Sequence, residues 1–184
     1  MADYPALETA RLILRPVTLA DAPAIQRIFP QWEIVRHLNA RIPWPYPDDG
    51  AESFFREVLS PQIAQGLSWA WSIFPKDAPG TLIGRIDLSD APGDNRGFWL
   101  DPAWQGRGLM GEAADVVTDY WFGPLGRSVM RIPKAVDNVA SRRISERQGM
   151  RIVSKCEKDY VCGRLPSEIW EITAAQWRAR TGMD

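Results

Sequence analysis

The sequence is poor in the features that would place it in several common classes of protein. It has two cysteines and one histidine among 184 residues, and no apolar run approaches the ~20 residues that a membrane-spanning helix needs. The 22 lysines and arginines nearly balance the 23 aspartates and glutamates, so the net charge of -1 indicates no general attraction to nucleic acid or to an acidic membrane. No repeat, low-complexity tract or Gly/Ser linker divides the chain. We therefore expect a single domain over residues 1–184, long enough to bury a core.

The start of the chain and its cysteines bear on location. Met1 to Tyr4 has no basic region followed by an apolar one, so no secretion signal is expected. Cys156 and Cys162 could pair across a hairpin, but in a protein without such a signal reduced thiols are expected. These observations predict a cytoplasmic protein.

What the chain does have is a glycine-rich loop, Gln105–Gly111, between the apolar run Gly97–Leu100 and a helical pattern that continues to Phe122. A strand that turns through glycines into a helix directs backbone N–H groups and the positive end of the helix toward one point, which suits a pyrophosphate. No Gly-Lys pair follows the glycines, which excludes the P-loop of nucleotide triphosphatases. The loop therefore predicts a site for a pyrophosphate-containing ligand.

Three segments together resemble one superfamily. The loop is similar to Q/R-x-x-G-x-G/A, the coenzyme A pyrophosphate loop of the GNAT acetyltransferases. Asn138–Ser141, followed by Gln148–Met150, resembles the N-x-x-S…x-G-F signature of the same fold. Thr9–Pro16 with Leu19–Asp21 resembles the start of the RimJ/RimL-type branch, the ribosomal-protein N-terminal acetyltransferases and their relatives. The segments follow family order across roughly four-fifths of the chain.

The expected fold is α/β (α+β). Patterning predicts strands over 11–15, 67–74, 81–88, 97–100, 128–136, 152–161 and 168–172, and helices over 21–29, 32–38, 49–65, 112–122 and 138–149, with a short one after Thr173. The helix 112–122 is a crossover, so the fourth and fifth strands should be parallel. The resemblance implies a GNAT fold, a mixed and mostly antiparallel sheet of about seven strands flanked by helices. In such folds the fourth and fifth strands splay apart, and the acetyl-pantetheine arm would lie between them.

The resemblance also implies acetyl-CoA as the acyl donor, with no metal. The loop would hold the pyrophosphate, with Arg107 adding charge, and the backbone near Trp99 would hold the thioester carbonyl and the pantetheine amides. Met110 stands where glycine or alanine is commonest, but its N–H remains free. The expected cofactor-binding residues are Trp99, Leu100, Asp101, Gln105, Gly106, Arg107, Gly108, Leu109, Met110, Gly111, Asn138 and Ser141.

Acetyl transfer requires a proton for the departing thiolate. In many GNAT enzymes a tyrosine seven residues after the asparagine supplies it, but that position is Ser145 here, and no tyrosine lies between Tyr120 and Tyr160. The resemblance implies that Ser141 lies near the sulfur instead, as a hydrogen-bond donor or as an acid. The alternative is an ordinary helical role for this serine.

The general base is open on sequence grounds. Candidates are Asp87, on an expected strand, and Glu33, after the first helix, with Asp101 also conceivable, and a carboxylate could act through water. The single histidine, His37, is more typical of a surface or cap residue.

Aromatic residues suggest where the acceptor binds. Trp44 and Tyr46 lie in a proline-rich segment, 41–47, that cannot be regular, and in related folds this region forms a wall of the acceptor groove. With Trp32 they are the acceptor-site candidates, and simple loop packing is the alternative.

The leading hypothesis is an acetyl-CoA-dependent N-acetyltransferase that transfers directly to a primary amine, with a protein N-terminal amine as the first acceptor considered. One alternative is a small-molecule acceptor such as an amino acid, polyamine or antibiotic. The other is a non-catalytic acyl-CoA-binding sensor. We expect a monomer or homodimer, with no nucleic-acid or membrane partner.

Overall fold

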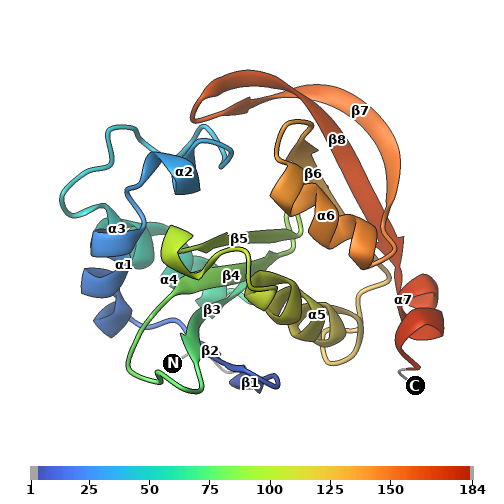
Figure 1. Ribbon diagram of the computed structural model, residues 1–184, viewed down its shortest axis with the longest axis horizontal. Coiled ribbons are helices and arrows are strands. Elements are labelled where there is room, and N and C mark those ends of the chain that lie inside the picture. Colours follow the sequence, from blue (N-terminus) through green and yellow to red (C-terminus); the bar gives the residue numbers. More distant parts are fainter. Residues whose placement is uncertain (1–3, 183–184) are drawn as a thin grey trace.

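The computed structural model describes residues 4–182, which form two antiparallel sheets with helices around them (Figure 1). Residues 1–3, on which the expectation about a leader partly rests, and residues 183–184 lie outside the described part. One sheet has the order β1-β2-β3-β4-β5 and the other has the order β6-β8-β7. The strands are β1 Leu7–Glu8, β2 Leu12–Pro16, β3 Ser68–Pro75, β4 Gly84–Ser89, β5 Arg96–Leu100, β6 Val129–Ala135, β7 Arg151–Tyr160 and β8 Gly163–Thr173.

The helices occupy most of the expected segments. They are α1 Ala22–Ile28, α2 Trp32–Val35, α3 Gly50–Phe54, α4 Ser60–Ala64, α5 Leu109–Phe122, α6 Val139–Arg147 and α7 Ala174–Thr181, with 3₁₀ turns at Leu19–Asp21 and Pro102–Trp104. The single helix expected over 49–65 is interrupted by a π-helical turn, Phe55–Leu59. Pro61 follows this turn and has no N–H to continue a regular α ladder, which accounts for the interruption.

Several helices begin or end with a capping residue. Thr18 and Thr173 each begin a capping box. The side chain of Asn138 accepts a hydrogen bond from the N–H of Ser141 and so caps α6. Gly149, directly after that helix, has a φ of +76°, the left-handed conformation that glycine adopts most easily.

The expected splay between the fourth and fifth expected strands has a visible cause at Asn95. The N–H of Asn95 donates to the carbonyl of Arg131 (2.8 Å), and the N–H of Arg131 donates to Asn95 Oδ1 (2.8 Å). A side-chain oxygen thus replaces the backbone acceptor that would continue a ladder. Within residues 4–182, β5 and β6 form no ladder, so the strands lie in two sheets that open from this point rather than in one continuous sheet of about seven strands.

The core holds the first sheet rigid on both faces. On one face Trp71, fully buried, makes edge-on contacts with Tyr4 (5.0 Å) and Tyr120 (5.4 Å) of α5. On the other, Phe74 of β3 packs in a cluster that includes Phe29 and the helices before β3. β3 is buried throughout and pairs with β4, which in turn pairs with β5 at the edge of the cleft described next.

Candidate active site

A cleft of about 740 Å³ lies between β5, the loop before α5, and α6; we call it the large cleft. All expected cofactor-binding residues except Asp101 and Arg107 line it, as does Glu33 on α2. Because β5 is the edge strand of its sheet, its outer side carries no ladder partner along Gly97–Leu100. The large cleft therefore presents a free strand edge to whatever enters.

The glycine loop places the start of α5 in this cleft. Gly106 and Gly108 both have a φ of +76°, and Gly108 is the N-cap of α5 in the left-handed conformation. The first N–H groups of a helix of this length have no partner in the helix itself, so they form an anion site. A Cβ built on Gly111 would lie 1.5 Å from Nη2 of Arg147, which shows how closely that guanidinium covers the helix start.

The glycines also satisfy the spacing G-x-G-x-x-G at Gly106, Gly108 and Gly111, the fingerprint of dinucleotide-binding folds. That fingerprint belongs to a parallel sheet with helices on both faces. Here β5, which leads into the loop, pairs with β4 in antiparallel fashion. The sheet, rather than the spacing, excludes a dinucleotide fold.

Two expected cofactor-binding residues turn away from the cleft. The guanidinium of Arg107 donates to the carbonyl of Ala103 (3.0 Å) and lies over the ring of Trp104 (4.9 Å). Asp101 Oδ1 accepts from the N–H of Ala103 (3.0 Å) and caps the short 3₁₀ turn. Arg143 and Arg147, one turn apart on α6, line the cleft and bring to it the kind of positive charge that Arg107 was expected to add. Sequence reasoning missed this pair, although its i, i+4 spacing is visible.

Ser141 lies where the large cleft meets a second space. This side cavity, of about 260 Å³, shares with the large cleft the residues His37, Leu38, Phe98, Trp99, Asn138 and Ser141. Ser141 sits in the first turn of α6, and its Oγ accepts a hydrogen bond from Nζ of Lys134 (2.6 Å). Sequence reasoning missed Lys134, even though the alternation Met130, Ile132, Lys134 along β6 puts it on the buried face.

A connection between the two halves of the molecule borders the side cavity. Residues 36–40, after α2, bond to residues 159–162 at the turn of the β7–β8 hairpin, and we call this the loop–hairpin junction (Figure 1). Its bonds run from the N–H of Val161 to the carbonyl of Leu38 (3.0 Å) and from the N–H of Cys162 to the carbonyl of Arg36 (3.1 Å). Asn39 and Tyr160 form an antiparallel bridge between them.

The family model described as the acetyltransferase (GNAT) domain matches residues 11–151. The chain belongs to the GNAT acetyltransferase family. A curated relative, the "Uncharacterized N-acetyltransferase YoaA" of Bacillus subtilis (strain 168), is 29% identical over 157 residues, 80% of this chain and 84% of that protein. The GNAT protein described here thus uses acetyl-CoA to acetylate an amine.

Solved structures show the same fold. The ribosomal-protein-S5-alanine acetyltransferase from Vibrio fischeri superposes with a TM-score of 0.79 at 17% identity, over 95% of this chain and 99% of that one. Mycobacterium smegmatis RimJ, in complex with CoA-disulfide, gives a TM-score of 0.77 at 16% identity, over 96% and 94%. The GNAT fold and its RimJ/RimL-like neighbours, expected from three motifs, are confirmed.

The two carboxylates considered as bases of this acetyltransferase lie in different surroundings. Both oxygens of Asp87, which lines the side cavity, accept hydrogen bonds from the guanidinium of Arg85 (2.9 Å each), so this carboxylate is already engaged by a neighbouring side chain. Glu33 is exposed at the rim of the large cleft. Asp94, which sequence reasoning missed, lines the side cavity, and burial raises its pKa, while Lys158 and Lys134 oppose this.

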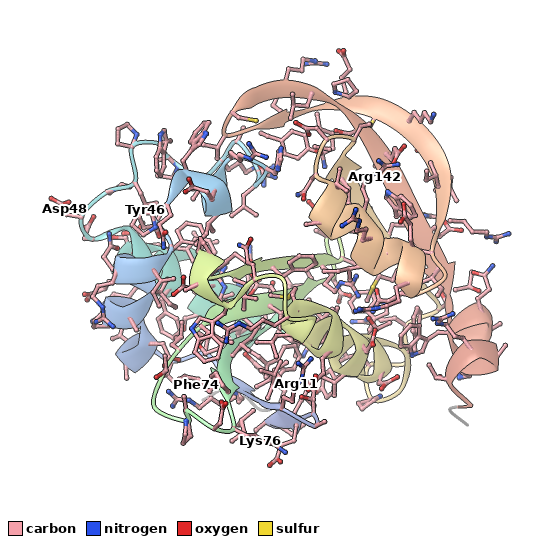
Figure 2. All side chains as sticks on the ribbon, in the orientation of Figure 1. Arg11, Tyr46, Asp48, Phe74, Lys76 and Arg142 are labelled. Atoms are coloured by element: carbon pink, nitrogen blue, oxygen red, sulfur yellow. The ribbon has the colours of Figure 1, made fainter. Side chains whose placement is uncertain are left out.

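The three aromatic residues expected at the acceptor site line neither space. Trp32 and Trp44 pack against each other (5.7 Å between rings) and are each 42% exposed. Tyr46 packs edge-on against Phe29 (5.1 Å), and Figure 2 shows it beside α1 and α3, away from α6. Burial raises the pKa of its phenol. Within the proline-rich segment 41–47, Ile42 does line the side cavity. The segment therefore forms part of the cavity wall, but through Ile42 and not through the expected aromatic side chains.

Charged metal ligands do not gather in the acetyltransferase: among residues 4–182, no group of three or more His, Cys, Asp or Glu side chains could hold a metal ion. In the same part of the chain, no helix is both long and apolar enough to cross a membrane.

Proposed function

We propose that the enzyme transfers the acetyl group directly from acetyl-CoA in the large cleft to a primary amine in the side cavity. The position of Ser141 carries this proposal, because it is a polar side chain at the meeting point of the two spaces. Cys156 and Cys162 are exposed on the β7–β8 hairpin and line neither space, which supports transfer without an acyl-cysteine intermediate.

In this proposal the pyrophosphate lies on the N–H groups of the glycine loop at the start of α5. Arg143 and Arg147 add positive charge, and the pantetheine amides pair with the free edge of β5 at Trp99 and Leu100. Asn138 holds the first turn of α6 in place, and Ser141 Oγ donates to the sulfur as it leaves.

The acceptor proposed first is a protein N-terminal amine. Support comes from the structural neighbours, one of which is named for an alanine of ribosomal protein S5 and another as a ribosomal L7/L12 alpha-N-protein acetyltransferase. In this reading the first residue of the acceptor enters the side cavity and the rest of the peptide remains outside.

A small primary amine is the second candidate, and a specific observation favours it. The side cavity holds about 260 Å³ and has the loop–hairpin junction as one border, with Leu38, Asn39, Asp159 and Tyr160 among its walls. A space of this size and border suits a compact molecule more readily than an extended chain.

One experiment separates these readings. The enzyme is incubated with acetyl-CoA and with a panel of N-terminal peptides, amino acids, polyamines and aminoglycosides, and both the release of CoA thiol and the mass of the product are measured. Acetylated peptides support the first acceptor, and acetylated small amines alone would replace it. Tight binding of acetyl-CoA with no turnover on any amine would defeat the enzyme proposal and favour the sensor.

We also propose a single domain over residues 1–184, a monomer or homodimer, and a cytoplasmic location. The two free and exposed cysteines support the location, because exposed thiols persist most readily in a reducing compartment.

A further inference from the structure

Lys134 occupies an unusual position for a lysine. Its side chain is 3% exposed, it lines the side cavity, and its Nζ lies 5.3 Å from the centre of the Phe98 ring. Apart from the bond to Ser141, it makes no hydrogen bond and no ion pair with any residue from 4 to 182. An ammonium group has three N–H donors, so the charged form would leave two of them buried without an acceptor.

The groups around Lys134 on the sheet side favour its neutral form. Burial, and after it the nearby charge of Arg96, hold the pKa of Lys134 well below its ordinary value, while Asp94 acts in the opposite direction. The guanidinium of Arg96 is itself buried, bonded to Thr118 Oγ1 (2.7 Å) and Gln148 Oε1 (2.8 Å). With its pKa lowered only to about 10, Arg96 remains a cation at neutral pH.

The ionisable groups that the other neighbouring elements bring near Lys134 are bound to partners other than Lys134. Lys134 lies opposite Glu168 in β8, but the carboxylate of Glu168 accepts from Arg142 (3.0 Å). On the α2 side, His37 Nε2 contacts Asp137 (3.2 Å). On β4, the carboxylate of Asp87 in the side cavity is bound to Arg85, as described above.

The hairpin contributes the remaining charges. Lys158 lies 4.0 Å from a carboxylate oxygen of Asp94, and Asp159 lies 3.6 Å from Arg164. Tyr160 shares a hydrogen bond with Ser167 (2.7 Å), and burial raises the pKa of its phenol. Among all these groups only Asp94 is oriented to favour a charged Lys134, and it is shared with Lys158.

We propose that Lys134 and Ser141 form a proton relay, which carries the proton lost by the acceptor amine in the side cavity to the sulfur of CoA in the large cleft. The proposal rests on the direct transfer described under Proposed function. It assigns Lys134 as the proton acceptor that sequence reasoning sought among Asp87, Glu33 and Asp101.

The steps balance as follows. The amine nitrogen attacks the thioester carbonyl carbon, the C–N bond forms, and the C–S bond breaks to leave a thiolate. The surplus proton on the new amide nitrogen passes to the lone pair of Lys134 Nζ, Ser141 gives its hydroxyl proton to the thiolate, and Nζ returns one proton to Ser141 Oγ. One proton has moved from nitrogen to sulfur, and both side chains are restored.

The observed hydrogen bond fits this sequence. Lys134 Nζ and Ser141 Oγ lie 2.6 Å apart, so a proton can pass directly from the amine to the hydroxyl group. A serine alone is a poor acid, but a serine whose proton is replaced as it leaves does not accumulate an alkoxide.

Three variants test the relay, with kcat measured against pH on an amine that the wild-type enzyme accepts. Lys134→Met removes both the N–H donor to Ser141 and the group that takes up the proton. Lys134→Arg keeps an N–H donor for Ser141 but cannot take up a proton, because arginine stays charged. Lys134→Gln is a second donor of this kind, in case the larger guanidinium does not fit. Acetyl-CoA binding, followed by thermal unfolding with and without ligand, shows that each variant is folded.

The relay predicts that all three variants lose about 100-fold or more in kcat while binding acetyl-CoA as the wild type does. It further predicts that the wild-type acid limb of kcat disappears in the variants, when the acceptor is an amine that stays unprotonated over the pH range. A Ser141→Ala, Lys134→Met double variant should be no slower than the slower single variant.

Near-wild-type kcat in Lys134→Arg or Lys134→Gln would overturn the relay and leave Lys134 as a residue that only positions Ser141. Additive losses in the double variant would also overturn it. A wild-type enzyme that acetylates no amine is a different failure, because it defeats the proposed function itself.

Discussion

Asn95 should stabilise the fold through several side-chain hydrogen bonds. It is 8% exposed, its Oδ1 accepts from the N–H of Arg131 (2.8 Å), and its Nδ2 donates to the carbonyls of Ser89 and Ala91 (3.0 Å each). Asn95→Ala removes these three bonds and leaves the Arg131 N–H without its acceptor. At about 1 kcal/mol for each bond, the free energy of unfolding should fall by about 3 kcal/mol.

For a chain of this length, about 3 kcal/mol corresponds to a fall of ~6–12 °C in the unfolding midpoint. Urea titration and thermal scans measure the two quantities. The matched control is Asn39→Ala, since Asn39 is exposed and, among residues 4–182, its Oδ1 accepts only from the nearby N–H of Arg41 (2.9 Å). The control should remain within about 0.5 kcal/mol of the wild type.

The same scans with acetyl-CoA examine the link to the site. If Asn95 sets the angle at which the two sheets open, the midpoint rise produced by the ligand should be smaller in Asn95→Ala than in the control. A loss of stability below about 1 kcal/mol relative to Asn39→Ala would refute the reasoning, because it would mean that the three bonds are replaced by water without cost.

Three further outcomes are expected. Gly111→Ala should raise the KM for acetyl-CoA several-fold without lowering the unfolding midpoint, because the new Cβ displaces the flexible Arg147 while alanine favours the helix; an unchanged KM would show that Arg147 does not matter there. Asp87→Asn should keep kcat within about threefold, because Arg85 already binds that carboxylate; a 100-fold loss would make Asp87 the base. Lys134 has a lower pKa folded than unfolded, so its cost to stability is complete below the folded pKa and disappears above the unfolded one. Lys134→Met should therefore raise the midpoint at neutral pH, and the rise should shrink above about pH 10; a rise independent of pH would contradict this.

Much of the donor side could be predicted from the sequence, because it depends on backbone shape. The glycines of the loop before α5 and the cap at Asn138 are local signals, and the left-handed glycines and the cap that they predict are present in the structure. Arg107 was a poor choice, because a side chain next to glycines can turn either way and here packs on Trp104.

The acceptor side was harder, because its residues meet only through tertiary packing. Lys134 and Asp94 belong to no motif, and their importance comes from burial and from neighbours far along the chain. The packing of Tyr46 could not be predicted for the same reason, since its partner Phe29, the C-cap of α1, is distant in the sequence. Where the two sheets part, a side-chain oxygen of Asn95 accepts from the backbone of Arg131, a long-range contact that no strand pattern reveals.

The loop–hairpin junction has a kinetic consequence. The two sheets are joined at Asn95 and Arg131, and the segment after α2 is joined to the β7–β8 hairpin where Leu38 meets Val161. The large cleft and the side cavity meet at Ser141. CoA can leave the large cleft while the acetylated amine stays in the side cavity, or the reverse. Product inhibition should therefore follow a random order of release. The amide protons of Val161 and Cys162, which form the hydrogen bonds of the loop–hairpin junction, should exchange with solvent as slowly as those of β7 and β8.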